Sequence, residues 1–161
     1  MAELFTTALF TTPSGVSFRR ATAADVPRIV QILIADQLGV SREGGDLAPY
    51  LAAFEAIDGD PAQLLVVGEQ HGEVVATFQL SFIPGLARRG SLRAQLEAVR
   101  VADSLRGSGI GTQMVEWAIA ESRRRGCSLV QLTTDKRRTA AHRFYQRLGF
   151  RMSHQGMKLQ L

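Results

Sequence analysis

The chain has 161 residues, 45% of them hydrophobic, and a mean hydropathy of +0.01, which fits a soluble protein with one sizeable core. No apolar run approaches the roughly 20 residues that span a bilayer, and the single cysteine, Cys127, excludes an internal disulfide or a cysteine-based metal cluster. The net charge of +4 is uneven: residues 1–84 hold four Arg or Lys and ten Asp or Glu, whereas residues 85–161 hold fifteen and five.

The N-terminal residues 1–15 are rich in threonine and are predicted to form a tail or a short edge strand. They carry an acidic residue and no basic stretch, which does not fit a signal peptide, so we expect a cytoplasmic protein. Val16–Arg20 alternates as a strand, and Thr22 followed by Asp25 predicts a capping box at a helix start. A second helix is predicted from the apolar stripe that follows Asp46.

The rest of the chain alternates strands with helices. We predict a hairpin of two strands, Gln63–Glu69 and Glu73–Phe82, and then a loop at 84–90 and a strand at Leu92–Val101. A helix at 109–125, a strand at Ser128–Thr134 and a helix at Thr139–Leu148 follow, and one or two strands are predicted within 150–161. Gly126 and Gly149 are expected to end the two helices. This order predicts an α/β fold with a mixed, mostly antiparallel sheet in a single domain.

A glycine-rich stretch at residues 106–112 lies between a predicted strand and a predicted helix. The first turn of a helix carries unpaired backbone N–H groups and the positive end of the helix dipole. Glycines remove the Cβ atoms that would keep an anion away from those groups. The stretch is therefore predicted to bind a phosphate or pyrophosphate, which indicates a phosphorylated cofactor and an enzyme.

Three phosphate-binding motifs can be compared with this stretch. A P-loop needs a lysine directly after Gly111, and this chain has Thr112 at that position. A dinucleotide fingerprint that starts at Gly107 needs a glycine at position 112, so Thr112 argues against it as well. The pattern Arg-x-x-Gly-x-Gly is matched in full by Arg106, Gly109 and Gly111. This motif resembles the acyl-CoA binding loop of the GCN5-related N-acetyltransferase (GNAT) superfamily.

Two more segments carry the same resemblance. Thr139–Phe150 resembles the second signature of the family, A-x-x-F-Y-x-x-L-G-F, and Val16–Asp25 resembles its first strand and helix start. The resemblance covers residues 16–161, which we interpret as one N-acetyltransferase domain with the GNAT fold. In this family the first two helices flank the acceptor pocket.

The resemblance also implies how acetyl-CoA is held. Backbone amides of the loop would bind the pyrophosphate, from Arg106, Gly107, Ser108, Gly109, Ile110, Gly111 and Thr112. In the family the preceding strand splays from its parallel neighbour, which leaves main-chain groups of Val99, Arg100 and Val101 to bond the acetyl carbonyl and the pantetheine. Arg138 stands where many members have an asparagine that contacts the pantetheine, which makes it a candidate CoA contact.

Glu97 and Tyr145 are the predicted catalytic residues. Glu97 lies two residues before Val99 on the same strand face, and its apolar neighbours would partly desolvate the carboxylate and raise its pKa toward that of a useful base. Family members often place a glutamate base at about this point; a salt-bridged or exposed glutamate and Asp103 as base stay open as alternatives. Tyr145 matches the signature tyrosine, which in many members hydrogen-bonds the CoA sulfur and could protonate the leaving thiolate.

The other reactive residue types have structural interpretations. Phe144 and Cys127 are expected in the core, His71 in a turn, and His142 on a helix surface, although it lies one turn from Tyr145. His154, near the final strands, is a weaker candidate for contact with the acceptor. The dispersed histidines and carboxylates show no metal-ligand spacing, so no metal is expected.

The resemblance thus implies an acetyl-CoA-dependent N-acetyltransferase that acetylates a small-molecule amine, or a protein amine, by direct attack in a ternary complex. A non-catalytic acyl-CoA sensor is the alternative, and it would not need Glu97 and Tyr145. The basic second half could indicate nucleic acid, but its arginines are scattered and no aromatics interleave with them, so neither nucleic acid nor membrane is an expected partner. A homodimer is a further expectation, through the N-terminal tail or an edge strand at Gly156–Leu161.

Overall fold

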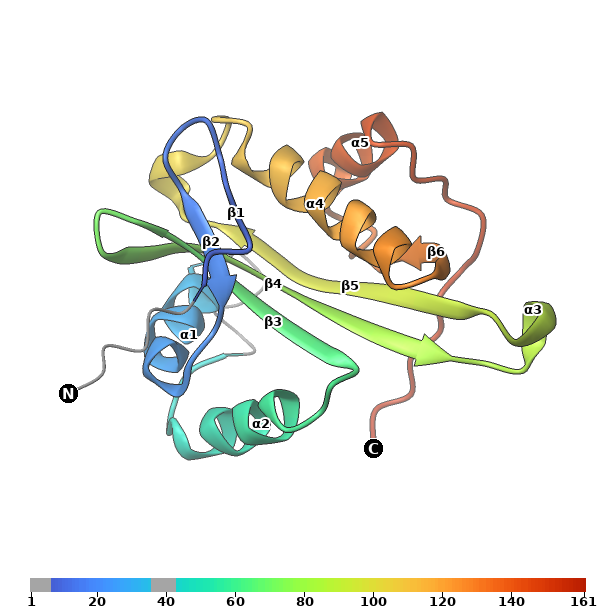
Figure 1. Ribbon diagram of the computed structural model, residues 1–161, viewed down its shortest axis with the longest axis horizontal. Helices are drawn as coiled ribbons and strands as arrows, with labels where there is room; N and C mark the ends of the chain where they lie inside the picture. The colour runs from blue at the N-terminus through green and yellow to red at the C-terminus, as the bar shows by residue number, and fades with distance from the viewer. Residues whose placement is uncertain (1–6, 36–42) are drawn as a thin grey trace.

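A six-stranded sheet in the order β1-β2-β3-β4-β5-β6 organises the chain (Figure 1). The computed structural model describes residues 7–35 and 43–161. Its strands are β1 (Phe10–Thr11), β2 (Ser17–Arg20), β3 (Gln63–Gln70), β4 (Glu73–Pro84), β5 (Leu92–Val101) and β6 (Cys127–Gln131). Strands β1 to β5 pair antiparallel with their neighbours, and β6 pairs parallel with β5. The mixed, mostly antiparallel sheet is confirmed, and β1 provides the edge strand expected within residues 1–15.

Helices cover both faces of this sheet. They are α1 (Val26–Ile34), α2 (Ala48–Asp58), the short α3 (Ala87–Gly90), α4 (Ile110–Arg124) and α5 (Thr139–Arg147), with 3-10 turns η1 (Ala23–Asp25) and η2 (Asp103–Leu105). Figure 1 shows α1 and α2 on one face, α4 and α5 on the other, and α3 at the tip of a long β4–β5 hairpin that projects from the body. Within residues 7–35 and 43–161, each helix is too short or too polar to cross a bilayer.

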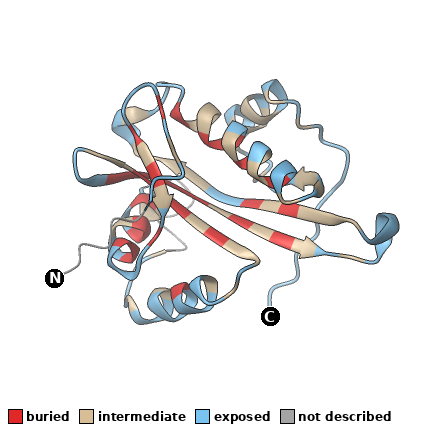
Figure 2. Cartoon of the chain, viewed as in Figure 1, coloured by how far each residue is buried: buried red, intermediate tan, exposed pale blue. Residues whose placement is uncertain are grey.

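Two apolar clusters lie on opposite faces of the sheet because successive strand residues point to opposite sides. The larger one packs the sheet against α4 and α5 and buries Phe18, Phe78 and Met114 completely or almost so. The smaller one packs α1 and α2 on the other face through residues such as Val30 and Phe54. Figure 2 shows the buried positions concentrated along the central strands and the inner sides of α1 and α4.

An ion-pair network joins β2 to the start of the first helix. Arg19 donates to both carboxylate oxygens of Asp25, at 2.8 and 2.9 Å, and to Glu69 at 3.0 Å. The backbone N–H of Thr22 donates to Asp25 at 2.7 Å, as the predicted capping box requires. Burial opposes ionisation of Asp25, but the bonds from Arg19 and Thr22 outweigh it and lower the pKa of this carboxyl.

The C-terminal segment differs from its prediction. One or two strands were expected in residues 150–161, including an edge strand at Gly156–Leu161, but residues 151–161 form no strand and are all exposed. The N–H of Ser153 donates to the carbonyl of Arg151 at 3.0 Å, a tight turn that an extended strand does not contain, and Gly156 interrupts the alternation that follows. The edge expected there for a homodimer is therefore absent from this segment.

Strand β6 is also shorter than the predicted Ser128–Thr134. It ends at Gln131, and its residues are exposed or half-buried, so the expectation of a buried strand was wrong. Its apolar residues Leu129 and Val130 occupy the unpaired edge of the sheet, where a hydrophobic run cannot be told from a central strand by sequence alone.

The network around Asp25 makes a prediction for stability. Asp25→Asn should lower the free energy of unfolding by about 2 kcal/mol at pH 7, because charge-assisted bonds are lost and Arg19 keeps its charge. A lowered pKa contributes stability that is present above the unfolded-state pKa near 4 and is lost as pH falls through the lower folded-state value. The difference between variant and wild type should therefore shrink below about pH 4.

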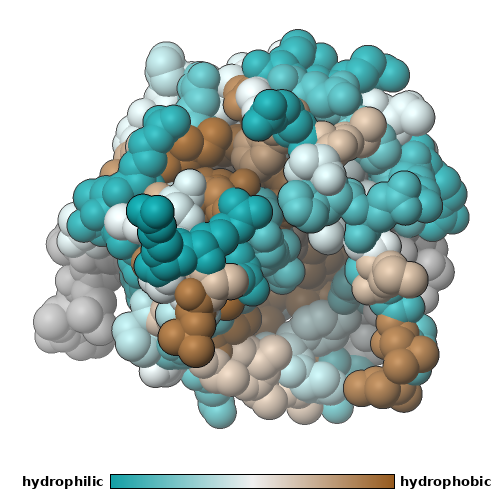
Figure 3. Space-filling view, turned by 90° about the vertical axis from the view of Figure 1, so that its right-hand side faces the viewer, coloured by the Kyte–Doolittle hydropathy of each residue, from teal (hydrophilic) through white to brown (hydrophobic). Residues whose placement is uncertain are grey.

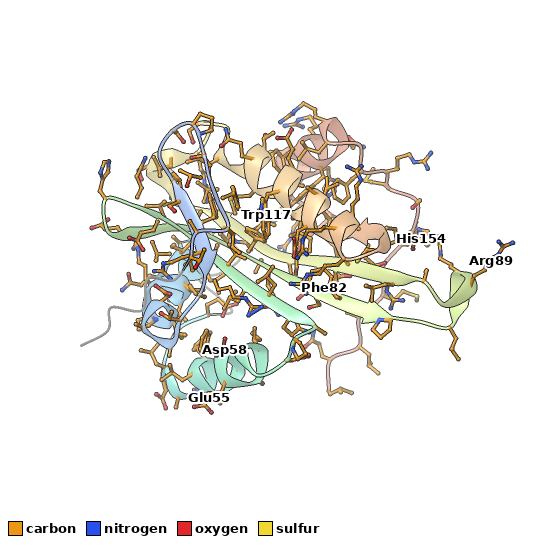
Figure 4. The ribbon with its side chains drawn as sticks, viewed as in Figure 1. Glu55, Asp58, Phe82, Arg89, Trp117 and His154 are labelled. Atoms are coloured by element: carbon orange, nitrogen blue, oxygen red, sulfur yellow. The ribbon has the colours of Figure 1, made fainter. Side chains whose placement is uncertain are left out.

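Urea denaturation followed by circular dichroism between pH 7 and pH 2 measures this difference. Glu55→Gln, which removes an exposed carboxylate of α2 (Figure 4), is the matched control and should leave the stability within about 0.5 kcal/mol. If the free energy of unfolding of Asp25→Asn differed from that of the wild type by the same amount at every pH, the lowered pKa of Asp25 would be contradicted.

Candidate active site

The glycine-rich loop joins β5 to α4. Gly107 and Gly109 have φ values of 80° and 85°, in the left-handed region that favours glycine, and Gly109 is the N-cap of α4. The N–H groups of residues 110–112 form the first helical turn and have no partner within the helix. The loop therefore presents several backbone donors together with the positive end of the helix dipole, which is the arrangement that binds a phosphate.

Contacts around the loop hold its shape. The hydroxyl of Ser108 donates to the carbonyl of Leu105 at 2.6 Å, and Arg106 pairs with Asp103 at 2.8 Å in an exposed ion pair. A side chain at Gly111 would begin 3.6 Å from the ring of Phe144, so the loop lies directly against α5. The helix that carries Tyr145 is thus fixed relative to the phosphate-binding turn.

Strand β5 separates from β6 immediately before this loop. Their described pairing runs from Leu92 opposite Cys127 to Gln95 opposite Gln131, while β5 continues for six more residues. Because backbone groups alternate in direction along a strand, part of the N–H and C=O groups of residues 96–101 faces the resulting gap. This is the separation that the family resemblance implied for Val99, Arg100 and Val101.

A bulge bends β5 at the same place. Thr77 pairs with Arg100 and Gln79 with Glu97, so Ala98 and Val99 together oppose one residue of β4. Ala98 has a φ of 51°, which is uncommon for a residue with a Cβ atom. Such strained positions cluster at functional sites, and this one re-aims the backbone beside the gap.

Tyr145 lies on the α4 and α5 side of the gap. Its ring meets the edges of Phe144 and Phe150 at centroid distances of 5.0 and 5.7 Å. Burial raises the pKa of Tyr145, while the charges of Arg100 and Arg138 oppose the rise. The phenol is protonated at neutral pH and can donate a hydrogen bond or a proton.

Glu97 lies on the opposite face of β5. Leu96 and Ala94 point into the larger core, so their neighbour Glu97 points to the side of α1 and α2. Its side chain is exposed, which contradicts the expected partial desolvation; the apolar residues next to it in sequence face away from it. The carboxylate is therefore accessible to a molecule that approaches this face of the sheet.

The remaining candidates are accounted for by local structure. His142 lies 3.0 Å from the carbonyl of Asp135 through Nε2, and His71 occupies the β3–β4 turn with a φ of 53°. Cys127 is half-buried, and burial raises its pKa, which makes it a poor nucleophile. Phe144 packs against the larger core as expected.

Arg138 precedes α5 in the chain, and His154 follows it. His154 is exposed and hydrogen-bonds Ser153 at 2.8 Å; Figure 4 shows it on the C-terminal segment at the end of the molecule from which the β4–β5 hairpin projects. Arg138 is the N-cap of α5. In the described part of the chain, no group of His, Cys, Asp and Glu could hold a metal ion.

A cavity of about 260 Å³ connects the loop to α1. Arg28 and Gln31 of α1 line it opposite Ala102, Asp103 and Arg106. Sequence reasoning missed Arg28 and Gln31, because a polar residue on an amphipathic helix looks like part of a solvated face. Only the packing of α1 beside the end of β5 brings them to the loop.

Comparison with known proteins gives a consistent picture. A model of the "Acetyltransferase (GNAT) family" matches residues 28–150. The chain is 32% identical to the aminoalkylphosphonate N-acetyltransferase of Salmonella typhimurium over 84% of this chain and 85% of the relative. It is 28% identical to the L-methionine sulfoximine/L-methionine sulfone acetyltransferase of Pseudomonas paraeruginosa over 88% of this chain and 83% of that protein.

The solved structures agree with this assignment. A crystal structure of a transcriptional regulator from Bacillus halodurans is 43% identical, with a TM-score of 0.87 over 91% of this chain and 99% of that one. The family match spans most of the sheet together with the glycine loop and the tyrosine helix, and the curated relatives are named acetyltransferases. The chain therefore belongs to the GNAT family and is an acetyltransferase.

Proposed function

We propose that the protein transfers an acetyl group from acetyl-CoA to the primary amine of a small molecule, by direct attack while both substrates are bound. The observation that carries this proposal is the gap between β5 and β6, which opens beside a phosphate-binding helix start and beside the protonated Tyr145. A thioester bound there would reach backbone donors, a hydroxyl donor and, through the bulge at Ala98, the face that carries Glu97.

The residues present fit acetyl-CoA. Its pyrophosphate matches the N–H groups of residues 110–112, and Arg106, which pairs with Asp103, lies in the same loop. The extended pantetheine has amide groups that pair with the backbone groups of Val99 to Val101 along the gap. Arg138, the N-cap of α5, would contact the pantetheine arm as well.

Glu97 and Tyr145 supply the two proton-handling groups of the reaction. Glu97 accepts, directly or through a water, the proton that the attacking amine loses as its nitrogen bonds the carbonyl carbon. Backbone N–H groups of β5 stabilise the negative charge on the carbonyl oxygen. As the C–S bond breaks, Tyr145 donates a proton or hydrogen bond to the departing sulfur, and the products are an N-acetylated amine and free CoA.

A small molecule is favoured as acceptor by the two curated relatives. Their names give an aminoalkylphosphonate and two amino-acid derivatives as acceptors, all of them small amines. A protein amine is the competing acceptor. The test is the release of free thiol from acetyl-CoA with and without a panel of small amines: release that depends on an amine supports the proposal. Thiol release that no amine accelerates, with tight acetyl-CoA binding, would instead support a non-catalytic acyl-CoA sensor.

The first prediction concerns the anchoring loop. Gly109→Ala should weaken acetyl-CoA binding about tenfold or more, because its Cβ atom would keep the pyrophosphate away from the N–H groups of the helix start. An alanine at a φ of 85° also costs about 1–2 kcal/mol in folding stability. Gly126→Ala is the matched control, because Gly126 follows the other end of α4 with a φ of 80°.

Isothermal titration calorimetry with acetyl-CoA, together with thermal melts, separates the two effects. Both variants should lose similar stability, and only Gly109→Ala should lose affinity. Equal affinities of the two variants would argue against pyrophosphate binding at this helix start.

The second prediction concerns the proton donor. Tyr145→Phe keeps the ring packing and should lower kcat by about one to three orders of magnitude, with little change in acetyl-CoA affinity. Because the pKa of Tyr145 is raised from its ordinary value of 10.0, the wild-type phenol stays protonated below that pH and the loss should be constant from about pH 6 to 9. Wild-type turnover by this variant in a steady-state assay would remove Tyr145 from the mechanism.

The third prediction concerns the base. Glu97→Gln keeps the shape of the side chain but cannot accept a proton at neutral pH. Its rate should fall most near pH 7 and recover toward high pH, where the free amine is already abundant. The pH–rate profile of kcat/KM for the amine measures this; a profile parallel to the wild type at every pH would leave Glu97 a structural carboxylate.

A further inference from the structure

Polar side chains gather on the sheet face that carries Glu97. Gln63 of β3, Gln79 and Ser81 of β4 and Gln95 of β5 form this set, which we call the amide row. Leu64, Leu80 and Leu96 alternate with them and are buried in the core under α4. The amide row therefore points to the side of α1 and α2.

The register of the sheet brings the amide row next to the predicted base. Gln79 pairs directly with Glu97, and Ser81 pairs with Gln95 one step further along the hairpin. Paired residues have Cβ atoms about 5 Å apart, and residues two positions apart along a strand are separated by about 7 Å. A molecule the size of a monosaccharide can therefore place its amine at Glu97 and its other groups over the row.

Hydrogen bonds within the row fix its orientation. The Oε1 atom of Gln63 accepts bonds from the Ser81 hydroxyl at 2.6 Å and from Nε2 of Gln79 at 3.0 Å. Gln131 of β6 donates to Oε1 of Gln95 at 2.7 Å. These bonds orient the amides, and each amide retains further hydrogen-bonding capacity for a ligand.

The row is more enclosed than an ordinary solvated face of a sheet. Its four members are half-buried. Figure 3, which looks onto the end of the molecule where the hairpin projects, shows the surface hollowed beside the hairpin. Oriented and partly desolvated amides bind a ligand with less loss of entropy than flexible exposed ones.

We propose that the amide row is the floor of the acceptor site and selects an amine that carries neutral hydroxyl groups, as an amino sugar does. This inference rests on the proposed function. Amide groups pair with hydroxyls because both can donate and accept. A buried amide left unpaired by a hydrocarbon acceptor costs about 1–3 kcal/mol, so the row also discriminates against such amines.

Charge argues against an anionic group at the row. Its four members are neutral, and the carboxylate of Glu97 at its end repels an anion. Of the arginines of β5 on either side of the row, Arg93 has its Nη1 atom 3.6 Å from where a side chain of Gly85 would begin, and Arg100 donates to the carbonyl of Val99 at 2.8 Å. An acceptor phosphonate would need a charge-assisted partner that the row does not provide.

The experiment compares amines in steady-state acetyl transfer by the intact protein. Glucosamine, cyclohexylamine and 2-aminoethylphosphonate are assayed with the wild type and with Gln79→Leu and Gln95→Leu. Each variant should raise the KM for glucosamine about three- to tenfold, as the loss of one neutral hydrogen bond predicts, with kcat changed less than twofold. The KM for cyclohexylamine should stay the same or fall.

Gln70→Leu is the matched control, because Gln70 lies at the other end of β3 and bonds the carbonyl of Ser14. It should behave as wild type with every amine. Thermal melts and acetyl-CoA affinity check that the variants fold, and Gln79→Met and Gln95→Met, which keep the side-chain length and add no charge, replace any leucine variant that does not.

The outcomes separate this inference from the proposed function. Transfer to glucosamine with unchanged KM in the variants, or an equal rise of KM for glucosamine and cyclohexylamine, would overturn the inference and leave the transferase in place. Preference of the wild type for 2-aminoethylphosphonate over glucosamine would also overturn it. Transfer to no amine, with normal acetyl-CoA affinity, would contradict the proposed function and this inference together.

Discussion

The pairing of β5 with two different neighbours determines the geometry of the whole site. β5 follows β4 along almost its full length but follows β6 only as far as Gln95. Beyond that point the bulge at Ala98 turns the strand away, and its backbone groups lose their parallel partner. Backbone N–H and C=O groups on such a strand edge are available to a ligand that completes their hydrogen bonds. The helix start at Gly109 and the helix that carries Tyr145 both border the opening.

Two faces of one strand separate the roles in the proposed reaction. Tyr145 and the apolar side chains of β5 lie on the side of α4 and α5, where burial keeps the phenol protonated. Glu97 and the amide row lie on the side of α1 and α2, where the carboxylate is accessible. An acceptor can approach from one side of the sheet while the leaving thiol departs on the other. This division follows from the period-two alternation of a strand and needs no movement of the main chain.

Much of the fold and the loop was predictable from sequence, whereas the surroundings of the site were not. Glycines at 107, 109 and 126 occupy positions with a left-handed backbone conformation, which glycine favours. The loop and the end of α4 can therefore be predicted from the local sequence. The exposure of Glu97 was predicted wrongly, because apolar neighbours in sequence point to the opposite face. The absence of a strand in residues 151–161 and the place of Arg28 near Arg106 depend on tertiary packing, and the amide row depends on the register of three strands. Sequence periodicity predicts none of these features.

Initial-velocity kinetics tests the central claim most directly. In a direct transfer the amine and acetyl-CoA occupy the gap and the adjoining sheet face at the same time, and no residue of the protein carries the acetyl group. Varying both substrates should give double-reciprocal lines that intersect, and acetyl-CoA alone should not acetylate the protein. Parallel lines, together with an acetyl adduct on the protein after incubation with acetyl-CoA alone, would contradict the account.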